Sequence, residues 1–217
     1  MFKKTFIIAA TGALLSTTAH AATEASAFTD LNLRAGPGPI YEIVSVIPAD
    51  GVVSVEGCLE TANWCKVAYD GTEGWASGDY LTAQVDNAPV VVYANRERVA
   101  VGTVTYEETR SADGTVAGGA AGALAGAAVG GPVGALAGVV LGGGLGAAVT
   151  PTETVTTYVV SNPVEPVYLE GEVVVGAGIP EAVTLVAVPD SDYSYAYVNG
   201  LPVIVEPQQR QIVYIVR

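Results

Sequence analysis

Short runs of alternating apolar and polar residues, separated by turn residues, fill the chain from residue 28 to residue 83. Val44 and Val46, for example, fall on one face of an extended run, which is the period-2 pattern of a half-buried strand. Asp70-Gly71 stands between two such runs and is a strong hairpin signal. The predicted strands are residues 29–33, 42–47, 52–58, 64–69 and 74–76. Several short strands at this spacing predict a small β-barrel of roughly 55 residues.

The last part of the chain, residues 151–217, repeats this β-type pattern. A run of β-branched residues at 154–160 opens it, and Asn199-Gly200 is a second strong hairpin signal. The other strand candidates are residues 166–175, 183–188, 193–198, 201–205 and 211–216. A further β-hairpin is predicted at 89–110, which contains two β-rich runs. The pattern as a whole predicts a mainly β protein with two small folded units.

Between these units lies an uncharged tract, residues 115–150, in which glycine recurs at every fourth position. A spacing of four places these glycines close to one stripe of an α-helix, and stripes of small residues allow close helix packing in membranes. In water each glycine costs a helix about 1 kcal/mol relative to alanine. A helix here therefore requires lipid or close packing. The repeated glycines are Gly118, Gly122, Gly126, Gly130, Gly134, Gly138, Gly142 and Gly146.

Pro132 interrupts this tract near its middle, because proline removes a backbone donor and clashes inside a helix. We therefore expect a hairpin of two short helices, at 116–129 and 133–148. The tract resembles the glycine-zipper segments of bacterial envelope proteins. That resemblance implies membrane contact through 115–150 or self-association into a homo-oligomer. The alternative is a flexible Gly/Ala linker between two folded units.

Residues 1–21 have the form of a secretory signal peptide. Lys3 and Lys4 precede a short apolar run, and residues 19–21 read Ala-His-Ala, an A-x-A cleavage site. We expect the mature chain to begin at Ala22 and to be exported to the periplasm, with association with the outer membrane as a further expectation. The alternative is an uncleaved anchor, which is disfavoured because the apolar run is too short to span a bilayer.

The charge of the chain argues against two classes of partner. The formal net charge is −13, and it becomes −15 after removal of residues 1–21, which contain two of the nine basic residues and none of the 22 acidic ones. Nucleic-acid binding requires a basic surface, so no nucleic-acid partner is expected. Docking on anionic lipid headgroups is disfavoured for the same reason.

The first unit resembles the bacterial SH3 domain (SH3b). Residues 31–38 read LNLRAGPG and are similar to the opening motif of that family, and residues 64–67 read WCKV and are similar to its W-x-K-V strand. Gly71, Gly74-Trp75, Tyr80 and Leu81 look like its G-x-x-G-W-V-x-x-x-Y-L ending. The resemblance covers residues 28–83. It implies an SH3-like barrel that acts as a binding module, often for peptidoglycan or other envelope ligands, and not as a catalyst.

A ligand groove is expected near the long loop after the first strand and the aromatic residues at the rim of the barrel. Aromatic side chains bind peptide or sugar surfaces through a large rigid apolar face. The alternative is that the aromatic residues, Trp75 and Tyr80 in particular, belong to the core and that the polar residues only hold the loop. The candidate ligand-binding residues are Asn32, Arg34, Tyr41, Trp64, Asp79 and Tyr80, with Trp75 as a further aromatic candidate.

Cys58 and Cys65 are the two cysteines of the chain. They lie on strands that the pattern predicts to be neighbours across a tight hairpin, in a chain that is expected to be exported. A disulfide is therefore predicted. A redox-active pair is the functional alternative, but the spacing is C-x6-C and not the C-x-x-C of redox motifs.

The C-terminal unit, residues 151–217, resembles an uncharacterised domain family of Gram-negative envelope proteins. Its segments that carry the resemblance are Val183…Val188-Pro189, Tyr195-Ala196-Tyr197-Val198-Asn199, Val205-Glu206-Pro207 and Arg210-Gln211-Ile212-Val213-Tyr214. This chain has Glu206-Pro207 where the family usually has Asp-Pro. The family has no established activity, so the resemblance implies an envelope location and no chemistry.

Several kinds of catalytic chemistry are missing from the sequence. The one histidine is His20, so the mature chain contains none, which removes Ser-His-Asp sites and histidine-containing zinc sites. No phosphate-binding G-x-x-x-x-G-K-[ST] motif is present. We therefore predict a non-enzymatic protein without metal or cofactor.

The leading functional hypothesis is an exported protein that binds peptidoglycan or an envelope protein. The alternative is a structural or pore-like oligomeric membrane protein, in which the SH3b domain is only a scaffold.

Overall fold

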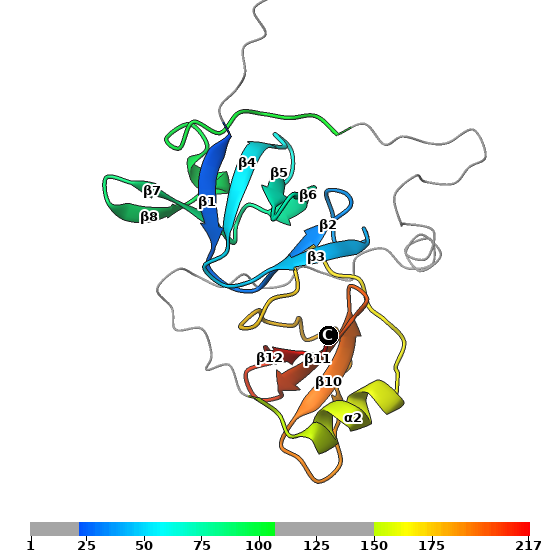
Figure 1. Cartoon of the computed structure of the whole chain (residues 1–217). Coiled ribbons are helices and arrows are strands. Elements are labelled where there is room, and N and C mark those ends of the chain that lie inside the picture. The colour runs from blue at the N-terminus through cyan, green and yellow to red at the C-terminus, as the bar shows by residue number, and fades with distance from the viewer. Residues whose placement is uncertain (1–21, 107–149) are drawn as a thin grey trace, which may run out of the picture.

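The structure is a computed structural model that describes residues 22–106 and 150–217 (Figure 1). The predicted signal peptide at 1–21 lies outside the described residues, and so does the glycine tract except for Thr150. Strands dominate the described part, as the sequence predicts. Within residues 22–106 and 150–217, neither helix has the length and apolar character needed to cross a bilayer.

The first domain is one antiparallel sheet that follows the SH3-like barrel pattern. Its strand order is β3-β2-β6-β5-β4-β1-β7-β8. The strands are β1 (Thr23–Ala27), β2 (Leu31–Arg34), β3 (Ile43–Ile47), β4 (Val52–Cys58), β5 (Trp64–Tyr69), β6 (Thr72–Ser77), β7 (Leu81–Val85) and β8 (Ala88–Val91).

Alternation of apolar and polar side chains explains how this sheet encloses its core. On β4, Val53 and Val55 are buried while Val52 and Ser54 face solvent. At the Asp70-Gly71 hairpin both residues have positive φ, of 46° and 77°, a conformation that glycine adopts freely and that aspartate tolerates. The hairpin predicted at this dipeptide is confirmed by the pairing of β5 with β6.

The hairpin predicted at 89–110 is wrong for the described part of that range. β8 pairs with β7, the strand before it. The chain then forms a short 3-10 helix, η1 (Tyr93–Asn95), and turns. The physical reason is the Asp86-Asn87 turn, where both residues have positive φ, of 52° and 62°. Asp and Asn adopt this left-handed conformation more readily than other non-glycine residues. The hairpin turn therefore falls at Asp86-Asn87, between β7 and β8, and not within residues 89–110.

The second domain contains one helix and a four-stranded sheet in the order β12-β11-β10-β9. Its elements are α2 (Glu153–Ser161), β9 (Val186–Ala187), β10 (Ser194–Val198), β11 (Leu201–Glu206) and β12 (Gln211–Ile215). The predicted hairpin at Asn199-Gly200 is confirmed, because β10 pairs with β11 across it and both turn residues have positive φ.

Two strand predictions in this domain are corrected by the structure. The β-branched run at 154–160 is helical, as part of α2. Val155 and Val159, one helical turn apart, are buried against Tyr195, Ile204 and Val213 on the sheet, so tertiary packing outweighs the weak intrinsic preference of β-branched residues for strands. Residues 166–175 form an irregular segment with one bridge to β10 and no strand.

A longer stretch, residues 165–183, contains residues 166–175 and is irregular throughout; we call it segment 165–183. It covers the face of the C-terminal sheet opposite to α2. Leu169, Val173 and Val174 from this segment are fully buried, and they belong to the same apolar cluster as Leu31 and Leu33 of the SH3-like sheet. Figure 1 shows this segment between the C-terminal sheet and strands β2 and β3. The two domains therefore share a core, with segment 165–183 as the layer between them.

Candidate functional site

Arg34, the last residue of β2, lies at the junction of the two domains. Its Nη1 donates to the carbonyl oxygens of Pro39 (3.0 Å) and Tyr41 (2.8 Å), which fixes the guanidinium against its own loop. Its Nε and Nη2 donate to Oε2 (2.5 Å) and Oε1 (2.6 Å) of Glu172 in segment 165–183. The Arg34 and Glu172 side chains are 1% and 0% exposed. The result is a two-pronged ion pair, a strong and geometrically specific form of carboxylate recognition.

Asn32 completes the contact to the same carboxylate. It lies two residues before Arg34, on the same face of β2, and its Nδ2 donates to Glu172 Oε1 (2.9 Å) and to the carbonyl of Val173 (3.4 Å). The backbone N–H of Val173 also donates to Oε1 (2.8 Å). Removing a charge from water is costly unless it is paired and hydrogen-bonded, and these donors meet that requirement for Glu172.

The C-terminal domain positions Glu172 through its backbone. Gly171 and Gly176 have φ of 93° and 91°, so the chain turns on either side of the buried residues 172–174. Asn199 holds the entry to this turn, because its side chain accepts from Leu169 N (2.8 Å) and donates to the carbonyls of Leu169 (3.1 Å) and Gly171 (3.2 Å). The exit is held by β12, where Ile212 exchanges backbone hydrogen bonds with residues 176 and 177.

Asn32 and Arg34 are among the predicted ligand residues, whereas Glu172 and the supporting role of Asn199 were not predicted. The signal for Glu172 is a single acidic residue directly before the apolar run Val173-Val174-Val175. A charge at the edge of such a run is expected to be either exposed or paired. The sequence does not show which of its few basic residues supplies the partner.

Arg217, at the C-terminus, adds a second cation close to this cluster. Burial lowers the pKa of its guanidinium, and the charge of Arg34 acts in the same direction, while the carboxylates of Asp30 and Glu172 raise it. The charges of Arg217 and of the ion pair therefore influence one another.

The aromatic side of the predicted groove is covered by another part of the chain. Tyr106 packs edge-on against Tyr41, with ring centroids 5.8 Å apart, and against Trp75, with centroids 5.5 Å apart. Trp75 is buried, and Gly36 packs against the Tyr41 ring so closely that a Cβ would overlap it. The polar and the aromatic candidates near the first loop are thus both covered by segments from outside residues 28–83.

The remaining predicted ligand residues are placed elsewhere. Trp64 and Tyr80 are each 4% exposed, and Tyr80 packs on Phe28 with ring centroids 5.5 Å apart. Asp79 is exposed and accepts a hydrogen bond from Asn63 Nδ2. The structure therefore brings Asn32, Arg34 and Tyr41 together around one loop and leaves Asp79 as the exposed member of the predicted set.

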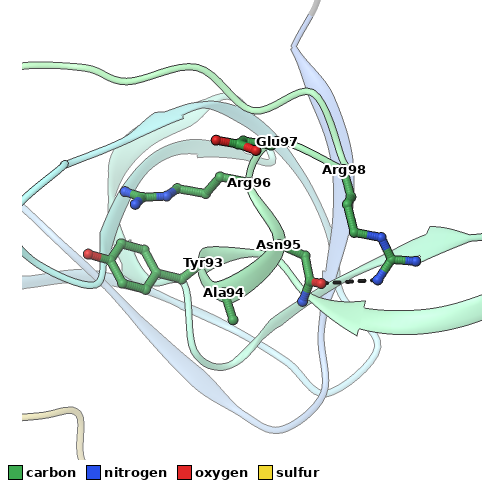
Figure 2. A pocket seen from close by; sticks show the side chains of 6 residues that line it. All are labelled: Tyr93, Ala94, Asn95, Arg96, Glu97 and Arg98. Atoms are coloured by element: carbon green, nitrogen blue, oxygen red, sulfur yellow. Dashed lines mark hydrogen bonds between the residues drawn. The ribbon is translucent and has the colours of Figure 1, made fainter.

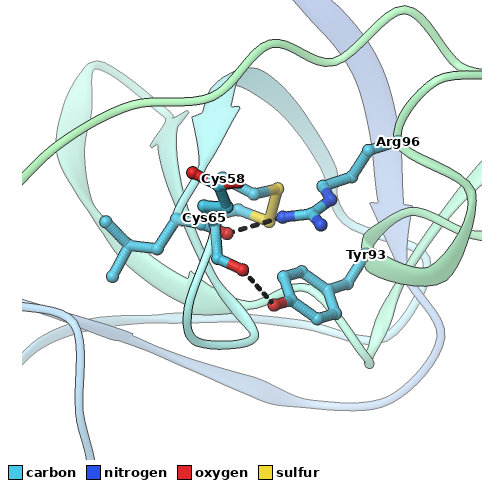
Figure 3. Close-up of a disulfide and its surroundings, with 6 residues drawn as sticks. Cys58, Cys65, Tyr93 and Arg96 are labelled. Atoms are coloured by element: carbon cyan, nitrogen blue, oxygen red, sulfur yellow. Dashed lines mark hydrogen bonds between the residues drawn. A yellow bond between two sulfur atoms is a disulfide. The ribbon is translucent and has the colours of Figure 1, made fainter.

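Cys58 and Cys65 form the predicted disulfide. They are direct cross-strand partners on β4 and β5, and both are fully buried. Figure 3 shows Arg96 and Tyr93 beside the bond: Arg96 Nη1 donates to the Leu59 carbonyl (2.6 Å), and the Arg96 guanidinium lies 4.4 Å from the centre of the Tyr93 ring. A bond buried in this way is typical of a structural disulfide and not of a reactive one.

A shallow pocket of about 290 Å³ lies next to this disulfide and is lined by residues 93–98 alone. Its side chains interact with one another: Arg98 Nη1 donates to Asn95 Oδ1 (3.2 Å), as Figure 2 shows. None of the predicted ligand residues lines it. Within residues 22–106 and 150–217, no three His, Cys, Asp or Glu side chains are grouped to hold a metal ion.

Comparison with known families agrees with the resemblances stated for the first unit and for the C-terminal unit. Residues 29–82 match the bacterial SH3 domain, and residues 158–217 match a domain of unknown function, DUF1236. The chain therefore contains a bacterial SH3 domain and a C-terminal DUF1236 domain. The Asn32–Arg34–Glu172 cluster lies between these two domains and includes residues of both.

Two curated relatives share a short part of this chain. A protein named as an N-acetylmuramoyl-L-alanine amidase, YrvJ of Bacillus subtilis, is 35% identical over 54 residues, which is 25% of this chain and 10% of that protein. A protein named as endopeptidase p60 of Listeria innocua is 39% identical over 62 residues, or 28% of this chain and 13% of that protein. The chain thus spans roughly a tenth of the length of these relatives, and the SH3 domain is the shared part.

Proposed function

We propose that this chain is an exported, non-enzymatic protein of the cell envelope whose SH3 domain binds a peptidoglycan or protein ligand. The observation that carries the proposal is the SH3 domain itself, which is shared with two proteins whose names describe an amidase and an endopeptidase. N-acetylmuramoyl-L-alanine, in the first of these names, is a unit of peptidoglycan. The shared module is far too small a share of either relative to be the whole enzyme, which supports a binding role for it over a catalytic one.

Export through residues 1–21 and assembly or membrane contact through residues 115–150 are further parts of this proposal. Both rest on the sequence, namely on the A-x-A site and on the uncharged glycine repeat. The missing histidine of the mature chain supports a binding role over nucleophilic catalysis.

Co-sedimentation with purified peptidoglycan sacculi tests the binding proposal. Glu172 covers Asn32 and Arg34, so the full chain and its Glu172→Ala variant are both measured. Chitin and cellulose serve as control polysaccharides without peptide. We expect saturable binding of at least one of the two proteins to sacculi and none to the controls. Sedimentation of neither, together with chemical crosslinking into large oligomers, would contradict the proposal and favour the alternative of a structural, pore-like assembly.

A further inference from the structure

The SH3 domain holds the carboxylate of Glu172 in the way that a receptor holds a ligand. Three of the four donors to this carboxylate are Asn32 Nδ2, Arg34 Nε and Arg34 Nη2, all from β2 of the SH3 domain. The acceptor comes from the other domain, 138 residues away from Arg34 in the sequence. We propose that Asn32 and Arg34 form a carboxylate-binding site of the SH3 domain, and that the C-terminal domain fills this site in cis with Glu172.

The SH3 domain shapes this site without help from Glu172. The Nη1 atom of Arg34 is held by the carbonyls of Pro39 and Tyr41, within the same domain. This contact directs the opposite edge of the guanidinium, Nε and Nη2, toward the position of the carboxylate. A guanidinium edge fixed in this way is pre-organised for two parallel hydrogen bonds, and pre-organisation increases affinity by reducing the entropy lost on binding.

Glu172 satisfies only part of the site. The side-chain oxygen of Asn32 is fully buried and has no hydrogen-bond partner among the described residues, although the side-chain nitrogen has two. Buried acceptors are normally satisfied. A ligand with an N–H close to its carboxylate would use both atoms of the Asn32 amide, and the last residue of a peptide has this chemistry.

The external ligand of the site is accordingly a peptide with a free carboxylate. This identification rests on the proposed function, because the peptides of peptidoglycan supply such carboxylates in the envelope. Glu172 then competes with the ligand, and the site is closed while the C-terminal domain is docked. Glu172 is suited to that role because its domain, through Asn199 and Ile212, holds it in place from outside the SH3 domain.

The chemistry of the site can be tested without any wall ligand. Replacement of Glu172 by alanine removes a group of the size of acetate, so the full-chain Glu172→Ala variant offers an empty carboxylate site. We expect its thermal midpoint to fall by about 10 °C, and 0.2 M acetate to raise it again by about 3 °C relative to chloride at the same ionic strength. Acetamide, which has the same shape and no charge, should have no effect.

The matched control is Glu170→Ala, because Glu170 is exposed two residues earlier. Neither this variant nor the unaltered chain should respond to acetate, since Glu172 still fills the site. An equal response of Glu172→Ala to acetate and acetamide, or no response to either, would overturn the proposal. If Glu172→Ala does not fold in chloride, folding in acetate but not in acetamide supports the proposal.

If Glu172→Ala folds in none of these solutions, Glu172→Gln gives the test, because this variant keeps the shape of Glu172 and loses its charge. A Glu172→Gln variant as stable as the unaltered chain would overturn the proposal of a carboxylate site. These results do not depend on whether the chain binds sacculi.

Discussion

The SH3 domain takes part in two ionic clusters that differ in burial. Arg34 and Glu172 are almost completely removed from solvent. Lys66 on β5 bridges Glu56 (2.8 Å) and Glu73 (3.2 Å) on the neighbouring strands, and these side chains are 35%, 35% and 65% exposed. In water the attraction between such charges is weak and is screened by salt, whereas a buried pair depends on its partner to compensate for lost hydration.

The difference shows what each cluster can do. The Lys66 cluster links strands that are already paired by backbone hydrogen bonds in one sheet, so it adds little stability to the fold. The Arg34–Glu172 pair connects two domains, and either charge becomes an uncompensated buried ion when the other is removed. The buried pair therefore links two events: when the C-terminal domain is docked, Glu172 fills the carboxylate site formed by Asn32 and Arg34 on the SH3 domain.

The largest effect is expected when the cation of the buried pair is removed. Arg34→Met leaves Glu172 buried without its charged partner and also removes the hydrogen bonds that Arg34 donates to the carbonyls of Pro39 and Tyr41. We expect a loss of about 3–5 kcal/mol in the free energy of unfolding, measured by urea denaturation. Arg98→Met, at an exposed arginine, is the control and should stay within about 0.5 kcal/mol. A loss below 1 kcal/mol for Arg34→Met would show that the pair is not buried in solution.

A smaller loss is expected when the charge of Glu172 is removed but its shape is kept. Glu172→Gln retains a carbonyl acceptor for Asn32 but cannot form the charged pair with Arg34. The expected loss is about 2–3 kcal/mol, against less than about 0.5 kcal/mol for Glu170→Gln at the exposed neighbour. Equal losses for the two variants would remove the contrast between buried and exposed carboxylates.

An apolar replacement of the whole pair sharpens the comparison further. In the double variant Arg34→Met with Glu172→Leu, no buried charge is left uncompensated. Such replacements are often neutral or stabilising, so we expect the double variant to be more stable than Arg34→Met alone. It does not recover the hydrogen bonds from Arg34 to the carbonyls of Pro39 and Tyr41, so it should remain less stable than the unaltered chain. A double variant as unstable as Arg34→Met would indicate that the hydrogen bonds of Arg34 to its own loop, and not the ion pair, are what the domain requires.

The smallest effect is expected at the exposed cluster. The hydrogen bonds that Lys66 donates to the carboxylates of Glu56 and Glu73 raise the pKa of its ammonium group. A raised pKa in the folded state stabilises the fold below the unfolded value of about 10.4, and this contribution is lost as the pH rises through the folded pKa. After allowance for solvent screening, Lys66→Met should cost less than about 0.5 kcal/mol near neutral pH. The difference between Lys66→Met and the unaltered chain should shrink as the pH rises through the raised pKa of Lys66, and it should also shrink in 1 M salt. A difference that is independent of both would exclude an ionic origin.

Local patterns were sufficient for strands β2 to β6 of the SH3 domain and for both tight turns at Asp70-Gly71 and Asn199-Gly200, whereas β1 and β7 were not among the predicted strands. Side-chain alternation along a strand and the positive φ of a turn are properties of a few neighbouring residues, so they can be inferred from the sequence. The disulfide followed from the same information, because Cys58 and Cys65 lie on strands joined by one short loop. The motif residues Asn32 and Arg34 were predicted as ligand contacts, and that role is still a prediction.

Tertiary structure alone decided the helix at 153–161 and the partner of Arg34. The valines of α2 are β-branched, and only the sheet face formed by Tyr195, Ile204 and Val213 makes a helix the better way to bury them. Glu172 reaches Arg34 across 138 residues of sequence, through a segment without regular structure that is held by Asn199 and β12. No local periodicity encodes such a contact, because the contact depends on how the two domains pack together and on the high cost of burying either charge alone.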